Sequence, residues 1–273
     1  MRHSLQTIPI CLARPVSNAT ARAFGRLYGR QRFQALFRRL HGGALVGLNY
    51  GNEDPHLNGE YALLDRLAAG WPDAPVVFDV GAFHGDWTSA VLERCPHATV
   101  YVFEPLSESF AFIGARLGGR ARLEHCALGA TEGSAAMWAP AGTHDWASLY
   151  ERDLSRFRRV AEPVETVKVQ RLDDVCAQHE VAHIDLLKID AEGNELAVLQ
   201  GAEAMLTRGA IDQIQFEFGG TAIDSRIFLR DIIRELAPAY RVHRILRDGV
   251  IEVANDEAEE IFTYANYLAS RVG

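Results

Sequence analysis

A strand, a glycine-containing loop and the start of a helix are predicted at residues 77–88, which read Val77-Phe-Asp-Val-Gly-Ala-Phe-His-Gly-Asp-Trp-Thr88. Gly81 permits a tight turn at the end of the strand, and Gly85 permits the helix to start close to a ligand. Loops of this kind cradle nucleotides, but the spacing differs from the GxGxxG pattern of a nicotinamide site. The stretch therefore predicts a nucleotide-binding α/β fold and disfavours a dehydrogenase.

Short β-rich runs alternate with helical runs on the carboxyl side of this stretch, as is typical of a parallel sheet with helices on both faces. Strands are expected at 76–80, 99–103, 122–127, 184–189 and 211–218. Helices are expected at 59–69, 87–94, 107–117, 195–206 and 226–236. An antiparallel pair at 240–246 and 250–253, around Asp248-Gly249, makes the predicted sheet mixed.

Two segments fall outside this alternation. Residues 134–170 contain Trp, Gly and Pro and a strand-like run at 164–169, and we expect an insertion over the carboxyl edge of the sheet. Residues 1–57 are predicted to form a basic helical extension of the main domain, which spans residues 58–273.

The extension carries apolar residues near helical spacing from residue 18 to residue 40, with arginines between them. The glycines that follow are expected to end the helix: Gly42, Gly43, Gly47 and Gly51. One interpretation is a helix packed on the domain with its arginines in solvent. The other is a helix that binds a membrane surface, an anionic partner or a second copy of the chain.

The formal charge of −8 is unevenly distributed along the 273 residues. Residues 1–52 contain eight Arg and no acidic residue, which leaves 20 basic and 36 acidic residues, a net −16, in the remainder. Because negative charge repels a phosphate backbone, the main body is not expected to bind nucleic acid. No apolar span of about 18 residues is present, so no transmembrane segment is expected.

Four cysteines, Cys11, Cys95, Cys126 and Cys176, lie far apart and form no CxxC pair. This spacing argues against a zinc knuckle or a dense disulfide framework and predicts a cytoplasmic protein. The Arg-rich, acid-free start of the chain is also typical of transit peptides.

An acid ends the second expected strand, in Val100-Tyr-Val-Phe-Glu-Pro105. A carboxylate at this strand end can accept hydrogen bonds from both hydroxyls of a ribose. Alternatively, Glu104 stabilises the N-terminus of the next helix. Together with the glycine loop, the position favours ribose binding.

Six motifs follow one another along the chain: Asp79-Val-Gly-Ala-Phe-His-Gly85, Phe103-Glu-Pro105, Ala127-Leu-Gly129, Leu172-Asp-Asp174, Leu187-Lys-Ile-Asp-Ala-Glu-Gly-Asn-Glu-Leu196 and Leu199-Gln-Gly201. Their combination resembles the FkbM family of S-adenosylmethionine-dependent methyltransferases over about residues 58–219. Phe83 departs from the family, which usually has Asn there. The resemblance implies a class I, Rossmann-like methyltransferase fold and O-methylation of a hydroxyl on a sugar, glycan or polyketide-type natural product.

The resemblance also implies a set of residues that bind S-adenosylmethionine. Its amino-acid end is assigned to Asp79, Gly81 and Gly85, with Ala82 between them, its ribose to Glu104, next to Pro105, and its adenine to the strand end at Cys126 and Ala127. Cys126 is expected to be a packed side chain rather than a reactive thiol.

Candidate catalytic residues follow the fourth and fifth expected strands. Asp190 and Glu217 are expected to face each other across adjacent strand ends, where they could hold a divalent cation or supply a general base. We favour the metal-independent alternative. His144, in the insertion, is the other candidate base. Two further functions remain open: a non-catalytic cofactor-fold subunit of a biosynthetic complex, and a nicotinamide-dependent oxidoreductase.

Overall fold

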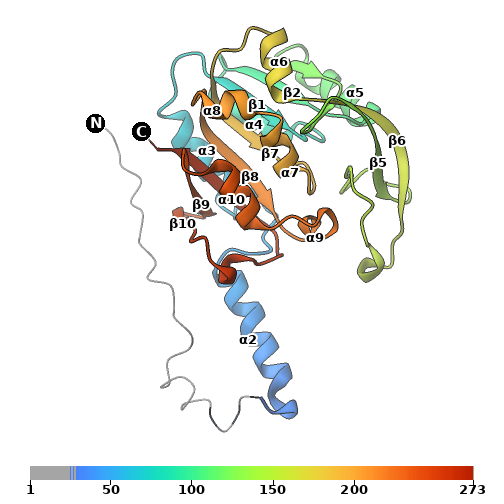
Figure 1. Cartoon of the computed structure of the whole chain (residues 1–273), viewed down its shortest axis with the longest axis vertical. Coiled ribbons are helices and arrows are strands. Elements are labelled where there is room, and N and C mark those ends of the chain that lie inside the picture. Colours follow the sequence, from blue (N-terminus) through green and yellow to red (C-terminus); the bar gives the residue numbers. More distant parts are fainter. Residues whose placement is uncertain (1–24, 26, 28, 273) are drawn as a thin grey trace.

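The main sheet has eight strands in the order β10-β9-β11-β8-β7-β1-β2-β3 (Figure 1). The computed structural model describes residues 25, 27 and 29–272. The strands are β1 (Val76–Val80), β2 (Thr99–Phe103), β3 (Arg122–Glu124), β7 (Ile184–Ile189), β8 (Ile211–Phe218), β9 (Tyr240–Leu246), β10 (Gly249–Glu252) and β11 (Ala265–Arg271). The first five pair in parallel, whereas β11 is antiparallel to both β8 and β9. The predicted mixed α/β sheet is confirmed.

Helices cover both faces of this sheet. They are α3 (Glu60–Ala68), α4 (Asp86–Arg94), α5 (Ser107–Leu117), α6 (Leu172–Gln178), α7 (Glu195–Gln200), α8 (Glu203–Thr207), α9 (Thr221–Ser225) and α10 (Leu229–Leu236). Side chains alternate between the faces, so Val77 and Val100 pack toward α3, α4 and α5, whereas Phe78 and Tyr101 pack toward the opposite core. This burial on both sides explains why the parallel strands read as nearly continuous apolar runs.

Two predicted elements are each divided in the structure. The helix expected at 195–206 breaks into α7 and α8 around Gly201, where an added Cβ would collide with the carbonyl oxygen of Gly129. The strand expected at 122–127 ends at Glu124, and the next two residues in strand conformation, β4 (Ala127–Leu128), pair with a different sheet.

The sequence analysis did not predict β11, although this strand lies between β8 and β9. Its residues Ala265 to Ala269 are all buried. Ala, Asn and Ser are weak strand formers, so the local signal is low, and the strand is stabilised by pairing on both edges.

The residues expected to form an insertion lie in a second sheet, which has the order β4-β6-β5. Its longer strands are β5 (Gly133–Pro140) and β6 (Ala161–Gln170), and a short 3₁₀ helix at Ser155–Phe157 lies between them. Leu106, Met137 and Val167 share a small hydrophobic cluster that packs this sheet beside the carboxyl ends of the main strands.

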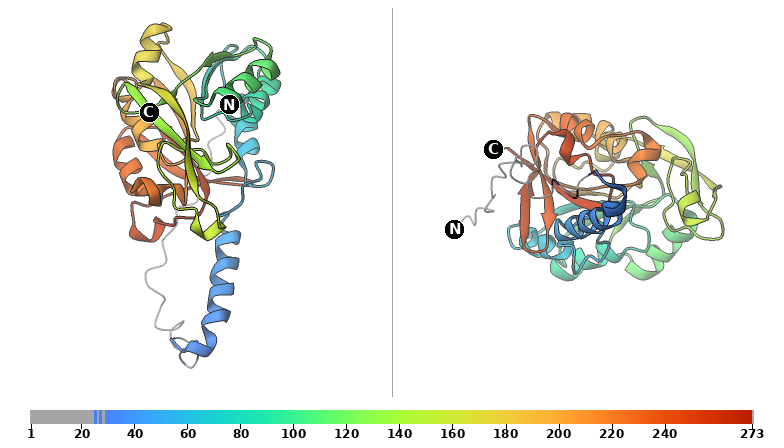
Figure 2. Two further views of the ribbon diagram at one scale, coloured as in Figure 1. Left: turned by 90° about the vertical axis from the view of Figure 1, so that its right-hand side faces the viewer. Right: turned by 90° about the horizontal axis from the view of Figure 1, so that it is seen from below.

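A helix outside the domain, α2 (Gln34–Gly47), follows a 3₁₀ turn at Gln31–Phe33 and projects away from the body of the molecule (Figures 1 and 2). It continues through Gly42 and Gly43 and ends at Gly47, so the expectation that the glycines end the helix is wrong for the first two and confirmed for Gly47. None of its residues is buried, so the interpretation of a helix packed on the domain is also wrong for α2. The predicted helical pattern at 18–24 lies outside the described residues.

The chain enters the domain immediately after α2. Tyr50 is buried in the main core, and the Gly51 N–H donates to the Tyr264 carbonyl oxygen at 2.7 Å. The Asn49 side-chain amide donates to the Ile245 carbonyl oxygen at 3.1 Å. Within the described part of the chain, no helix is long and apolar enough to cross a bilayer.

Candidate active site

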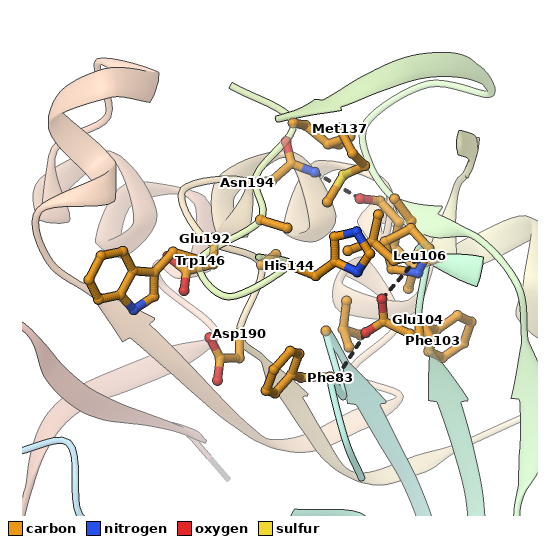
Figure 3. Close-up of a pocket in the computed structure, with 18 of the residues that line it drawn as sticks. Phe83, Phe103, Glu104, Leu106, Met137, His144, Trp146, Asp190, Glu192 and Asn194 are labelled. Carbon is orange, nitrogen blue, oxygen red and sulfur yellow. Dashed lines mark hydrogen bonds between the residues drawn. The ribbon is translucent and has the colours of Figure 1, made fainter. Parts of the chain in front are cut away.

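A cavity of about 390 Å³ opens at the carboxyl ends of β1, β2 and β7 (Figure 3). This volume is within the range of about 300–1,000 Å³ that is typical of small-molecule sites. The loops after the three strands contribute Gly81, Glu104 and Asp190 to its lining, and the insertion contributes Met137, His144 and Trp146. The cavity therefore lies where ligands bind in open α/β sheets.

The loop after β1 passes very close to the loop after β7. Gly81 has φ +78°, and an added Cβ would collide with the carbonyl oxygen of Asp190. The Asp190 N–H donates to the Val80 carbonyl oxygen at 2.9 Å. Gly81 is therefore required for this approach of the two loops as well as for the turn itself.

Asp79 takes a position different from the one implied by the resemblance. Its side chain is fully buried beneath the loop, where it accepts a hydrogen bond of 2.6 Å from the Thr88 hydroxyl and lies 3.5 Å from Lys188 Nζ. Asp79, Ala82 and Gly85 are not among the residues that line the cavity. In this arrangement Asp79 supports the loop from below.

Glu104 lines the cavity as predicted, although only 5% of its surface is exposed. One carboxylate oxygen accepts from the Phe83 N–H at 2.8 Å and the other from the Leu106 N–H at 2.9 Å (Figure 3). Each oxygen keeps capacity for a further donor. Burial raises the pKa of Glu104 to about 7, because these two backbone donors only partly offset the loss of solvation.

Phe83 contributes to the site through its backbone. Its N–H donates to the Glu104 carboxylate, and any residue at this position can make that hydrogen bond. Replacement of the family's usual Asn by Phe therefore does not remove the bond. The residue has φ +51°, a left-handed conformation in which Asn is enriched, and its ring stacks on His84 with centroids 3.7 Å apart.

The predicted adenine region is brought to the same cavity. Pro105, Cys126 and Ala127 all line it. Cys126 is buried, and burial raises the pKa of its thiol to about 12. The prediction of a packed, unreactive thiol fits this environment.

Asp190 and Glu217 lie at adjacent strand ends, as expected from the parallel pairing of β7 with β8. The two carboxyl groups are close enough to influence each other's titration. Burial and the negative charge of Asp190 raise the pKa of Glu217 well above its usual value, which favours the protonated form of Glu217. Asp190 lines the cavity, whereas Glu217 is not among the residues that line it.

Lys188 supplies the positive charge for this group of acids. Its Nζ lies 3.2 Å from Asp190 Oδ2 and 3.5 Å from Asp79 Oδ1, and only 6% of the residue is exposed. The charges of Asp190, Asp79 and Glu60 keep its pKa above the usual value despite burial. Glu60, which the sequence analysis missed, is carried there by α3 and accepts a 2.8 Å hydrogen bond from Gln215.

Hydrogen bonds made by the side chains of Glu195 and Asn194 hold the loop after β7 in place. A carboxylate oxygen of Glu195 accepts from the N–H groups of Ala191 and Gly193. Asn194 donates to the Leu128 carbonyl oxygen at 2.8 Å and lines the cavity (Figure 3). Asn194 was also missed as a site residue, although it belongs to the most specific of the six motifs.

Glu192 faces the cavity on the side of the insertion. Its carboxylate lies 3.1 Å from an Arg152 guanidinium nitrogen. Burial and the Asp190 charge raise the pKa of Glu192 to about 8, although Arg152 opposes the shift.

His144 also lines the cavity, but its Nδ1 lies 3.0 Å from a carboxylate oxygen of the exposed Glu108. This contact holds the ring beside a carboxylate at the surface. Among the described residues, one group of three metal-ligating side chains has all its ligand atoms within 4.8 Å of one another: His183, Asp185 and Asp212. It lies at the amino ends of β7 and β8, away from Asp190 and Glu217.

The parallel strands, the antiparallel β11 and the cavity at the carboxyl edge define a class I methyltransferase fold. The chain belongs to the FkbM methyltransferase family, because residues 79–244 match the family model described as "Methyltransferase FkbM domain".

Two curated proteins are similar to this chain. A "2-O-methyltransferase NoeI" from Sinorhizobium fredii is 30% identical over 152 residues, which are 50% of this chain and 60% of that protein. A "31-O-demethyl-FK506 methyltransferase FkbM" from Streptomyces tacrolimicus is 32% identical over 157 residues, 47% of this chain and 59% of that protein. The matches thus span about three fifths of each relative. A crystal structure of a putative O-methyltransferase from Klebsiella pneumoniae aligns with a TM-score of 0.44 at 14% identity, covering 94% of this chain and 98% of that one.

Proposed function

We propose that this protein is an S-adenosylmethionine-dependent O-methyltransferase that acts on a hydroxyl of a sugar, glycan or polyketide-type natural product. The observation that carries the proposal is that Glu104 and Asp190 line one cavity from two different strand ends. The names of both curated relatives refer to methylation at an oxygen position, which supports an oxygen acceptor.

The residues around Glu104 fit the cofactor. The carboxylate is held by two backbone donors and can accept ribose hydroxyls, and the apolar side chains of Leu106, Leu128 and Met137 offer a surface for a flat adenine ring. When bound, S-adenosylmethionine supplies an electrophilic methyl group. The chain's contribution is to orient it and to exclude water, since proximity accounts for much of the rate of such a displacement.

On the acceptor side, Asp190 accepts the proton of the attacking hydroxyl. Its carboxylate lines the cavity and accepts a hydrogen bond from Lys188, while the raised pKa of Glu217 disfavours Glu217 as the base. Lys188 already supplies positive charge beside Asp190, so we favour this metal-independent mechanism over a divalent cation bridging Asp190 and Glu217. A chelator tests this preference, because a bridging metal would make activity sensitive to EDTA and restorable by Mg²⁺ or Mn²⁺.

Calorimetry with S-adenosylmethionine, S-adenosylhomocysteine and NAD tests the cofactor assignment. We expect binding of the first two and none of NAD. Glu104→Ala should weaken binding by about 1–3 kcal/mol through the loss of charge-assisted hydrogen bonds. Unchanged affinity in this variant, or tight binding of NAD, would overturn the assignment in favour of an oxidoreductase.

Methyl transfer to a panel of glycans and macrolides, followed by mass spectrometry, tests the reaction. Asp190→Asn should retain cofactor affinity and lose about 10²-fold or more in turnover. The matched control is Asp185→Asn, at the other end of the same strand. Full activity of Asp190→Asn would exclude Asp190 as the base and move the test to His144. Cofactor binding without transfer to any acceptor would instead favour the non-catalytic subunit.

We also propose a cytoplasmic location, which the free thiols of Cys95, Cys126 and Cys176 support.

A further inference from the structure

The helix α2 presents an apolar stripe that the domain does not cover. Leu36, Leu40 and Ala44 recur at helical spacing and therefore lie on one side of the helix, where all three are exposed. Leu36 is 46% exposed and Leu40 is 52% exposed. Only Leu45, on the other side of α2, packs against the main core. The exposed stripe is thus separate from the attachment of the helix to the domain.

The charge around this stripe has one sign. Arg38 and Arg39 lie on the remaining surface of α2, and Arg30 and Arg32 precede the helix. Within the part of the chain that the structure describes, none of these arginines forms an ion pair with an acidic side chain. Residues 1–52 contain eight Arg and no Asp or Glu, so the surface complements a partner that is both anionic and apolar.

A second copy of α2 does not meet this description. Pairing two α2 helices along their stripes would bring arginines of like charge together, with no acidic side chain on either helix to balance them. An anionic bilayer offers acyl chains to the stripe and headgroup phosphates to the arginines at the same time. A 14-residue helix that packs on the domain only through Leu45 near its end is marginal in water, so a surface that buries one side would also stabilise it.

We propose that α2 docks the protein on the surface of a bilayer that contains anionic lipid. The helix lies in the plane of the interface with Leu36 and Leu40 among the acyl chains and the arginines at the headgroups. This proposal does not depend on the chemistry of the cavity, because no residue of α2 lines it.

Sedimentation of the full chain with phosphatidylglycerol–phosphatidylcholine vesicles tests the proposal. We expect binding to these vesicles, about fivefold weaker binding for each arginine replaced in Arg38→Ser and Arg39→Ser, and release at high salt. Leu36→Asp should lose at least tenfold in affinity. Ala35→Asp is its matched control, because the exposed Ala35 lies outside the stripe and receives the same new charge.

Several outcomes would overturn the proposal: equal binding to pure phosphatidylcholine vesicles, equal loss in Leu36→Asp and Ala35→Asp, or no binding to vesicles at all. Light scattering of the lipid-free protein tests the alternative that a second copy of the chain occupies the stripe. A dimer that Leu36→Asp dissociates would assign the stripe to a second copy instead. Calorimetry with S-adenosylmethionine on the same variants should show unchanged affinity, which separates a failure of docking from a failure of the proposed enzyme function.

Discussion

At the scale of single residues, the site is characterised by acids whose protonation the fold controls. Glu104, Glu192 and Glu217 all have pKa values raised by burial, while Lys188 neutralises the acids beside it. Their roles differ because their neighbours differ. Glu104 receives backbone N–H groups, whereas Glu217 faces another carboxylate.

The pKa of Glu104 predicts how cofactor affinity depends on pH. In the proposed assignment the ribose hydroxyls donate to the ionised carboxylate, so cofactor affinity should be full near pH 8 and fall by about tenfold per pH unit well below pH 7. The stability of the free protein should depend on pH in the opposite direction. Because the pKa of Glu104 is raised in the folded state, its contribution to stability is lost as pH rises through about 7. Calorimetry of wild type and Glu104→Gln between about pH 5.5 and 8.5 measures the first effect. A Glu104→Gln protein that keeps the wild-type pH profile would contradict the assignment.

Lys188 provides a second test at this scale. Lys188→Met leaves Asp79 and Asp190 without their buried counter-charge, so we expect a loss of about 3–5 kcal/mol in the free energy of unfolding, measured in urea. Lys168→Met is the matched control, because Lys168 is the only other lysine and is exposed, and it should change stability by less than about 0.5 kcal/mol. Equal effects in the two variants would show that the pairing of Lys188 contributes little.

At the scale of elements, close backbone contacts place the loops around the cavity. The break between α7 and α8 and the approach of the loops after β1 and β7 both require glycine, at Gly201 and Gly81. Packing of this kind transmits small changes in volume to the neighbouring elements, because protein interiors are close-packed.

Gly201→Ala tests the contact between α7–α8 and the start of the second sheet. The new methyl group would collide with the Gly129 carbonyl oxygen, so we expect thermal unfolding to show a loss of about 1–3 kcal/mol. Gly133→Ala, where an added Cβ meets nothing within 4 Å, should be neutral or slightly stabilising. A neutral Gly201→Ala would mean that the two elements separate easily.

At the scale of the whole molecule, the two ends of the described chain differ in their coupling to the core. The helix α2 projects from the body and buries no residue, whereas β11 pairs along both edges in the interior of the sheet (Figure 1). The free energy of folding should therefore depend strongly on β11 and hardly on α2.

Two truncations measure this difference by circular dichroism during heating. Removal of residues 1–48 should shift the unfolding midpoint by only a few degrees, because Tyr50 and the core are retained. Removal of residues 265–273 should abolish the cooperative transition, because β8 and β9 both lose their partner. A cooperative transition in the protein without residues 265–273, or an unfolded protein after removal of residues 1–48, would contradict this prediction.

The sequence by itself determined the parallel strands at 76–80, 99–103, 184–189 and 211–218, the helix at 107–117 and the positions of Glu104 and Asp190 at strand ends. These features follow from hydrophobic periodicity and turn residues, which act over a few neighbouring positions. The parallel direction of the strands then places the residues after them at a common edge of the sheet.

Only the tertiary structure decided which distant groups complete the site and how each acid is held. Glu60 reaches Lys188 from α3, Asp79 lies below its loop, and β11 enters the sheet between strands that precede it in the chain. None of these has a local signal, because burial, pairing on two edges and shifts in pKa depend on neighbours far apart in the sequence. For the same reason the periodicity of α2 indicated a helix but did not reveal whether the domain would cover its apolar side.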